Sequence, residues 1–250
     1  MGGPADFLLM TDLTSPLSQA PAALPRRAFM RVAGASAATV GLVLAGCGSD
    51  DPTPTTSDPN LLRLGGDDNG LLNYFYLLKQ LQASLYQKVV DAPPSDLLPG
   101  DRTIFTDLRD HELVHRVTLR FALATNAYDA NLATPLAFDF STFSLTTRAG
   151  VLAAAQQLED VSVAAYAGAL RLIDTPATLA LLAKIASVEA RHSAVVRDLR
   201  TPGSFANDDT VVTAGALQNV SVAKTPVQVV AETRAFFLPI VVSPDLLPTT

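Results

Sequence analysis

Two Glu-x-x-His pairs are the residues of this sequence with the clearest capacity for chemistry. Glu112 precedes His115 by three positions and Glu189 precedes His192 by three, in a chain with only three histidines. Residues three apart lie on the same face of an α-helix, so each pair can present a carboxylate and an imidazole together. Oxygen and nitrogen donors of these kinds bind iron and manganese in proteins. The spacing therefore predicts that both pairs contribute ligands to a metal site.

A third glutamate, Glu159, shares the setting of the two pairs. All three segments are largely apolar at helical spacing apart from these positions. The flanking residues are Phe105, Leu108, Leu119 and Ala122 in the first, Leu182, Ile185, Val196 and Leu199 in the second, and Leu152, Ala155, Ser162, Tyr166 and Ala169 in the third. A helix with this pattern buries its apolar stripe. Because burying an unpaired charge costs several kcal/mol, carboxylates that converge from three helices need a cation between them.

Helical periodicity predicts four long helices that would position these residues. They cover residues 67–90, 101–126, 146–173 and 176–199, and the second connection is a long crossover over residues 127–144. Such connections describe an all-α four-helix bundle with one long crossover. Residues 201–250 are rich in Val, Thr and Pro. We expect them to form an irregular C-terminal extension that packs on the bundle and contains one short helix over residues 225–237.

At these residues the chain resembles a known family. It is similar, over residues 66–200, to the ferritin-like domain proteins of bacterial lipoproteins and plant desiccation-related proteins. The resemblance implies two metal ions bridged by the glutamate of each pair, each ion also held by one histidine and by a terminal glutamate from the first or third helix. It implies iron or manganese that reacts with oxygen or peroxide, and as metal ligands Glu112, His115, Glu159, Glu189 and His192. The phrases that carry it are Leu158-Glu159-Asp160, Ala165-Tyr166, Ser187-Val188-Glu189-Ala190-Arg191-His192 and His111-Glu112-x-x-His115.

The first helix departs from the family pattern. Relatives carry a glutamate seven residues before an inward tyrosine, as Glu159 precedes Tyr166, but the residue seven before Tyr86 is Lys79. Three carboxylates and one ammonium sum to a charge of −2, which balances one divalent ion. A second divalent ion about 4 Å from the ammonium would be repelled by roughly 8 kcal/mol at an effective dielectric constant of about 20. We therefore expect that the half of the two-ion site next to the first helix is impaired. The chain would then bind one ion rather than two or, in the extreme case, none.

Four more residues are expected to surround the ligands. Tyr86 and Tyr166 are expected as core residues whose hydroxyl can bond a ligand carboxylate. Gln82 is the polar neighbour of Lys79 on the first helix, and His111 is expected beside the site. The run His111-Glu112-Leu113-Val114-His115 also matches the zinc-protease pattern of two histidine ligands and a glutamate base. This alternative leaves the second Glu-x-x-His pair without a role.

Composition excludes several other functions. Hydrophobic residues make up 48% and charged residues 17% of the chain, which is unlike an intrinsically disordered protein. The net charge of −6 argues against nucleic acid as a partner, because phosphate binding requires clustered Lys and Arg. The single cysteine excludes a disulfide or a cysteine-based metal cluster within the chain.

The first 47 residues are predicted to be an export signal. Arg26 and Arg27 resemble the twin-arginine motif, an uncharged run follows over residues 32–45, and Leu44-Ala45-Gly46-Cys47 resembles a bacterial lipobox. We expect Cys47 to be lipidated and to hold the exported chain on a membrane, facing the periplasm or the cell exterior. Residues 48–66 contain many Pro, Thr and Asp residues and are predicted to be a flexible tether.

Two functions stay open on the sequence alone. The first is an iron or manganese protein that reacts with a small oxidant. The second is a metal-free structural module that protects against stress such as desiccation. Ferrous oxidation or peroxide turnover that depends on Glu159 and Glu189 would separate them. Association into a homo-oligomer also stays open.

Overall fold

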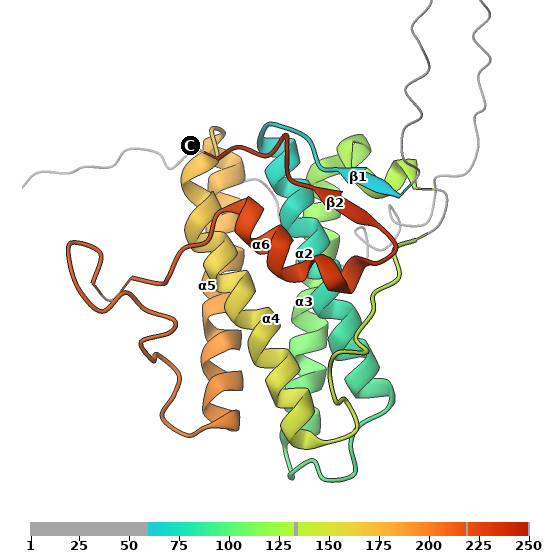
Figure 1. The fold of residues 1–250 in the computed structure, drawn as a ribbon, viewed down its shortest axis with the longest axis vertical. Coiled ribbons are helices and arrows are strands. Elements are labelled where there is room, and N and C mark those ends of the chain that lie inside the picture. The colour runs from blue at the N-terminus through green and yellow to red at the C-terminus, as the bar shows by residue number, and fades with distance from the viewer. Residues whose placement is uncertain (1–59, 133–134, 219, 250) are drawn as a thin grey trace, which may run out of the picture. The chain divides into compact units, whose positions relative to one another are not determined.

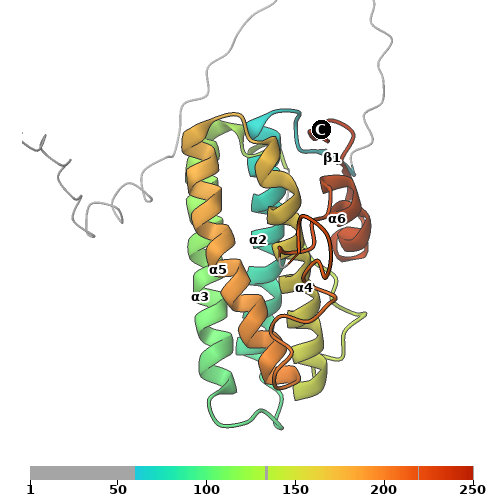
Figure 2. The same ribbon diagram turned by 90° about the vertical axis from the view of Figure 1, so that its left-hand side faces the viewer.

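Four long helices run beside one another in the computed structural model, which describes residues 60–132, 135–218 and 220–249 (Figures 1 and 2). They are α2 (Asp68–Asp91), α3 (Asp101–Leu123), α4 (Arg148–Ala169) and α5 (Pro176–Arg200). Helix α2 packs along α3, α4 packs along α5, and α2 also contacts α4. The predicted all-α bundle of four helices with one long crossover is confirmed.

Local sequence signals determine where these helices begin. The side chain of Asp67 caps α2 by accepting hydrogen bonds of 2.9 and 3.2 Å from backbone N–H groups of the first turn. Thr147 caps α4 in the same way, and Pro176 begins α5, where its missing N–H would have no helical partner. Two helix ends differ from the prediction. Helices α3 and α4 finish in the 3₁₀ turns Ala124–Asn126 and Leu170–Leu172, which apolar periodicity does not distinguish from α-helix.

The apolar core forms two clusters, and a polar group of side chains touches both. Tyr86 and Phe105 belong to the smaller cluster, whereas Phe75 and Tyr166 belong to the larger one. The hydroxyl of Tyr86 and the ring of Tyr166 both face the polar group, which includes Lys79. The packing of the four helices thus holds the candidate site in the middle of the bundle, away from its ends.

The predicted tether over residues 48–66 does not extend as far as residue 66. Residues Leu61–Arg63 form strand β1, which pairs in parallel with strand β2 (Val241–Ser243). Leu62 and Leu64 are buried in the core. This corrects the prediction, which considered only the polar composition of the segment and not a partner strand far along the chain. Residues 48–59, the predicted export signal with Arg26 and Arg27, and the predicted lipidation site Cys47 lie outside the described residues.

The C-terminal extension is more regular than predicted. Helix α6 (Pro226–Thr233) begins with a capping box between Thr225 and Gln228, continues as the 3₁₀ turn η4 (Arg234–Phe237) and leads into β2. Helix α6 packs against α4 and lies outside the four-helix bundle (Figures 1 and 2). Several of its apolar side chains and those of η4 join the core, namely Val229, Val230, Phe236 and Phe237.

The contact between α4 and the segment before α6 depends on a glycine. The backbone N–H of Lys224 donates to the carbonyl of Ala164 at 3.0 Å, and a Cβ added at Gly168 would lie 1.9 Å from the carbonyl oxygen of Lys224. We predict that Gly168→Ala lowers the free energy of unfolding by about 1–3 kcal/mol, because the two backbones must separate. Urea unfolding measures this, and a change below about 0.5 kcal/mol would contradict the close packing of the extension.

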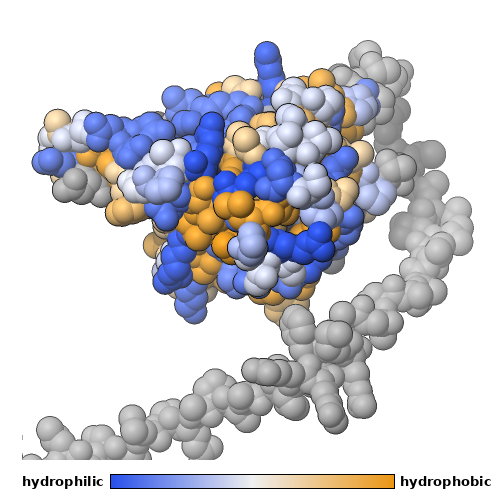
Figure 3. Space-filling view, turned by 90° about the horizontal axis from the view of Figure 1, so that it is seen from below, coloured by the Kyte–Doolittle hydropathy of each residue, from blue (hydrophilic) through white to orange (hydrophobic). Residues whose placement is uncertain are grey.

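The surface of the bundle is mixed in character. Figure 3 shows hydrophobic surface near the centre of the view from below, surrounded by hydrophilic side chains. Leu98, in the connection between α2 and α3, is among the exposed large apolar residues. Among the helices that the structure describes, none combines the length and the apolar character that crossing a bilayer requires.

Candidate metal centre

Three helices bring four potential metal ligands together inside the bundle. Glu112 comes from α3, Glu159 from α4, and Glu189 and His192 from α5. One ligand atom from each residue can be chosen so that all four lie within 4.8 Å of one another. The three carboxylates are completely buried, and His192 is almost so. The mid-helix positions that were predicted from apolar spacing therefore converge in a water-excluded interior.

The fourth helix contributes a cation. The side chain of Lys79, on α2, is completely buried, and its Nζ atom lies 3.0 Å from Oε2 of Glu112. The same ammonium group donates a hydrogen bond to Oε2 of Glu189 and another, of 3.1 Å, to Oγ of Ser162. Lys79 thus occupies the position where the family resemblance implies a fourth carboxylate, and its ammonium group binds Glu112 and Glu189 directly.

Lys79 and Glu189 stay charged because each stabilises the other. Burial lowers the pKa of Lys79, but the carboxylates of Glu112 and Glu189 outweigh that effect and the pKa is raised overall. Burial raises the pKa of Glu189, but the ammonium of Lys79 and the neighbouring imidazoles hold it well below its usual range. The pair is therefore a buried salt bridge, in which loss of either partner would leave an uncompensated charge.

Glu159 is placed differently from the other two acids. Its Oε1 atom accepts a hydrogen bond of 2.5 Å from the hydroxyl of Tyr86, whereas its Oε2 atom has no hydrogen-bond partner in the described part of the chain. Burial, together with the negative charges of Glu189 and Glu112, raises the pKa of Glu159 to about 8. In the absence of a metal ion this carboxyl group therefore carries a proton at neutral pH.

The Nδ1 atoms of two histidines face the carboxylates. Nδ1 of His115 lies 3.1 Å from Oε1 of Glu189, and Nδ1 of His192 lies 3.0 Å from Oε1 of Glu112. Burial lowers the pKa of His192, but its hydrogen bond to Glu112 and the other two carboxylates raise it overall. The imidazole of His192 can therefore hold a proton when no metal is bound and offer its Nδ1 lone pair when that proton leaves.

His111 contacts a ligand histidine. Its Nδ1 atom lies 3.0 Å from Nε2 of His192, and the two rings are stacked with an interplanar angle of 9°. His111 is exposed, so it links the buried imidazole to solvent. Without an ion, Nδ1 of His192 donates to Oε1 of Glu112; if an ion binds, a proton kept on Nε2 and donated to His111 leaves Nδ1 free as a metal ligand. The zinc-protease alternative does not fit this arrangement, because His111 and His115 face different partners.

Two of the surrounding residues have polar groups that remain partly unsatisfied. Gln82 donates from Nε2 to Oε2 of Glu189 at 3.4 Å, while its own Oε1 lacks a hydrogen-bond partner among the described residues. The hydroxyl of Tyr166 likewise lacks one, and the Tyr166 ring stacks on Phe75 and lies 5.8 Å from Nζ of Lys79. Both residues therefore line the cluster, Gln82 through a long hydrogen bond to Glu189 and Tyr166 through its ring.

Sequence reasoning did not assign a role to Ser162. Its hydroxyl donates to Oε2 of Glu189 at 2.6 Å and accepts the hydrogen bond from Lys79. The available signal was a serine three positions after Glu159 on an otherwise apolar stripe. Ser162 completes the set of partners around Lys79 and Glu189, and so stabilises the position of the ammonium group.

The donor set fits one divalent ion. Carboxylate and imidazole groups suit iron and manganese, and the unpartnered Oε2 atom of Glu159 lies in the cluster that also includes His192. The Oε2 atoms of both Glu112 and Glu189 already bind the ammonium of Lys79. Without an ion, protons on Glu159 and His192 balance the remaining charge.

The comparison with known families agrees with the fold and the cluster. Residues 67–202 match the ferritin-like domain family, and this segment contains the four helices and every residue of the cluster. No curated protein matches the chain. Since the matched segment covers more than half of the chain, and its helices form the bundle with buried glutamate and histidine side chains, the protein belongs to the ferritin-like domain family.

Proposed function

We propose that this chain is an exported, lipid-anchored ferritin-like protein that binds one iron or manganese ion per bundle. The observation that carries the proposal is the position of Lys79, whose ammonium group binds Glu112 and Glu189 from within the cluster. It replaces the positive charge that a second ion would supply. The cluster then keeps a net charge of −2 from three carboxylates and one ammonium, which one divalent ion neutralises.

The residues that would hold the ion are Glu112, Glu159, Glu189 and His192. A bound iron or manganese ion would supply electron transfer to oxygen or peroxide. The protein contributes a dry site, since the carboxylates are fully buried, and a hydrogen bond from Tyr86 that orients Glu159. His115 lies beside Glu189, and its Nδ1 atom can still interact with Oε1 of that carboxylate when the ion is bound.

The pair formed by His111 and His192 provides a route for protons. The exposed ring of His111 is hydrogen-bonded to Nε2 of His192, and the Nδ1 atom of His192 faces Glu112 inside the cluster. A proton that leaves the cluster when an ion binds can therefore pass to solvent through two imidazoles. This supports reversible loading without opening the bundle.

Metal analysis of the purified chain tests the proposal. After anaerobic loading with ferrous or manganous ions and removal of loosely bound metal, we expect one ion per chain. Glu189→Gln should reduce the number of bound ions to near zero. Glu232 is an exposed glutamate that pairs with Lys224, and Glu232→Gln should leave the number of bound ions unchanged. Two tightly bound ions in the unaltered chain would contradict the role of Lys79.

A specific observation also favours a second function, that of a metal-free protective or structural bundle. The charges of Lys79, Glu112 and Glu189, with protons on Glu159 and His192, already balance without an ion. If no metal is retained and neither ferrous oxidation nor peroxide turnover depends on Glu159, this second function is the better description.

The export part of the proposal rests on the sequence. Arg26 and Arg27, the uncharged run that follows them and the lipobox ending at Cys47 support a signal that is removed when the cysteine is lipidated. The mature chain would then face the periplasm or the cell exterior on a lipid anchor. Mass spectrometry of the N-terminal peptide from membrane fractions, with Cys47→Ser as the control that should release the chain, measures this directly.

A further inference from the structure

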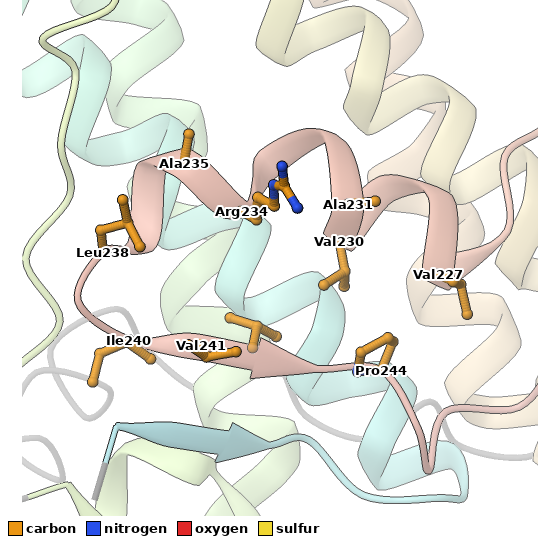
Figure 4. A pocket seen from close by; sticks show the side chains of 10 residues that line it. Val227, Val230, Ala231, Arg234, Ala235, Leu238, Ile240, Val241 and Pro244 are labelled. Carbon is orange, nitrogen blue, oxygen red and sulfur yellow. The ribbon is translucent and has the colours of Figure 1, made fainter. Parts of the chain in front are cut away.

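A groove of about 630 Å³ separates the C-terminal helix from the strand that follows it (Figure 4). One wall is α6 with η4, and the other is the segment that contains β2. Figure 4 shows Val227 and Val230 directed from α6 toward the strand, with Val241 and Pro244 on the opposite side. The walls are almost entirely apolar. The groove therefore offers a hydrophobic surface outside the bundle and away from the metal centre.

Apolar side chains are exposed along the groove. Leu238 is 59% exposed, Val241 is 50% exposed and Val227 is 44% exposed. Three apolar side chains at this level of exposure along one groove mark an interaction surface rather than scattered surface residues. The patch borders a cavity into which further apolar groups can insert.

The chain enters the domain at the same place. The backbone N–H of Val241 donates a hydrogen bond of 2.8 Å to the carbonyl of Asn60, so the groove wall is bonded to the first described residue. Only twelve residues lie between Cys47 and Asn60. The thirteen steps from Cys47 to Asn60 span at most about 47 Å. A lipid on Cys47 would therefore hold the edge of the groove within about 47 Å of the bilayer.

The charges around the groove favour an anionic lipid surface. Arg63, which is exposed at the end of β1, and Arg234, on the groove wall, form no salt bridge with the residues that the structure describes. The acids nearby already have partners. Asp139, whose backbone N–H donates to the carbonyl of Phe236, accepts a hydrogen bond of 2.8 Å from the backbone N–H of Ser141. Ser243 donates to Asp245 at 2.7 Å, and Lys224 pairs with Glu232 at 2.7 Å. Two arginines without acidic partners beside an apolar patch suit lipid headgroups above acyl chains.

We propose that the groove between α6 and β2 is the face with which the anchored domain rests on its own membrane. Leu238, Val241 and Val227 insert at the boundary between headgroups and acyl chains, and Arg63 and Arg234 bind the phosphates. This inference rests on the proposed lipid anchor at Cys47. It adds that the anchored domain has a fixed orientation. The bundle axis and the metal centre are then held in a defined position above the bilayer.

Fluorescence of the mature lipoprotein in vesicles tests the proposal. When Cys47 is lipidated it has no free thiol, so an environment-sensitive dye labels only an introduced cysteine. We compare Leu238→Cys with Phe121→Cys, which places the dye at an apolar position on α3, outside the groove, that is 75% exposed against 59% for Leu238. The vesicles contain phosphatidylcholine and phosphatidylglycerol, with lipids that carry a quencher near the headgroup.

We expect quenching at position 238 to be several-fold stronger than at position 121, and to fall when Arg63→Glu and Arg234→Glu are introduced. Equal quenching at the two positions in an anchored chain overturns the docking face and leaves the anchor intact. A dye that labels Cys47 itself in the unaltered chain overturns the anchor, and this inference with it. A blue shift that grows with protein concentration in detergent, without vesicles, overturns the inference in favour of a second copy.

Discussion

Lys79→Glu is expected to raise the metal capacity of the chain from one ion to two. The substitution removes the ammonium group that binds Glu112 and Glu189 and restores a carboxylate on α2, so the cluster carries four negative charges. Four carboxylates balance two divalent ions, and His115, whose Nδ1 atom already faces Glu189, becomes available to the second one. Metal content per chain after anaerobic loading measures the change. A variant that still binds a single ion would show that Lys79 does not limit the stoichiometry.

Lys79→Met separates the charge of the lysine from its volume. Methionine fills a similar space but leaves Glu112 and Glu189 without their buried counter-ion. We expect the metal-free variant to lose about 3–5 kcal/mol of unfolding free energy, because removing one partner of a buried ion pair leaves the other uncompensated. A divalent ion should restore part of this loss. Unfolding in urea, with and without metal, measures both effects, and unchanged stability without metal would show that the salt bridge is not needed.

Glu159→Gln is expected to abolish metal binding and, at high pH, to stabilise the metal-free protein. The pKa of Glu159 is raised to about 8 in the folded chain, against an ordinary value of 4.5. The folded state therefore binds this proton more tightly than the unfolded state. Its contribution to stability is complete below about pH 4.5 and is lost as the pH rises through about 8, by at most about 5 kcal/mol. Glutamine cannot ionise, so the variant should not show this loss.

Glu189→Gln is the matched control for Glu159→Gln. The pKa of Glu189 is held well below its usual range, chiefly because Lys79 offsets the effect of burial. Its charged form therefore stabilises the protein above the ordinary glutamate pKa, and that stability is lost as the pH falls. We expect Glu189→Gln to destabilise the metal-free chain at neutral pH, opposite in sign to Glu159→Gln, although both remove the ion. Equal effects of the two substitutions on stability would contradict the assignment of protons.

Metal binding should also become tighter as the pH rises toward 8. An ion must displace the proton on Glu159 and the one on His192, whose pKa is also raised, so it competes with two protons at lower pH. Metal titrations of the unaltered chain between about pH 6 and pH 8 measure this change, and an affinity that does not vary over that range would contradict the assignment of protons to Glu159 and His192.

The helices and the convergence of the acids follow from local patterns in the sequence. Glu112, Glu159 and Glu189 interrupt apolar stripes at the middle of their helices, and four antiparallel helices of similar length bring such positions to the same level. The place of Lys79 in the cluster could also be predicted from spacing. Lys79 lies seven residues before Tyr86, just as Glu159 lies seven residues before Tyr166. Periodicity is informative here because each helix has one buried face.

Contacts between residues that are distant in the sequence, or that belong to no periodic pattern, could not be predicted from apolar periodicity. The pairing of Leu61–Arg63 with Val241–Ser243 involves two three-residue segments, neither of which has an alternating pattern long enough to indicate a strand. The contact between His111 and His192 depends on how α3 and α5 approach each other, which the sequence of either helix does not specify. Side-chain rotamers and helix packing decide such pairs, and both are properties of the assembled bundle.

The pairing of β1 with β2 affects the order in which the chain folds. The two strands lie 180 positions apart, from Leu61 to Val241. Closing so long a loop costs chain entropy, so this contact forms after the local contacts between neighbouring helices. Until then β1 presents an open edge, which favours association with other chains. Truncation before Val241 would make that aggregation-prone state permanent.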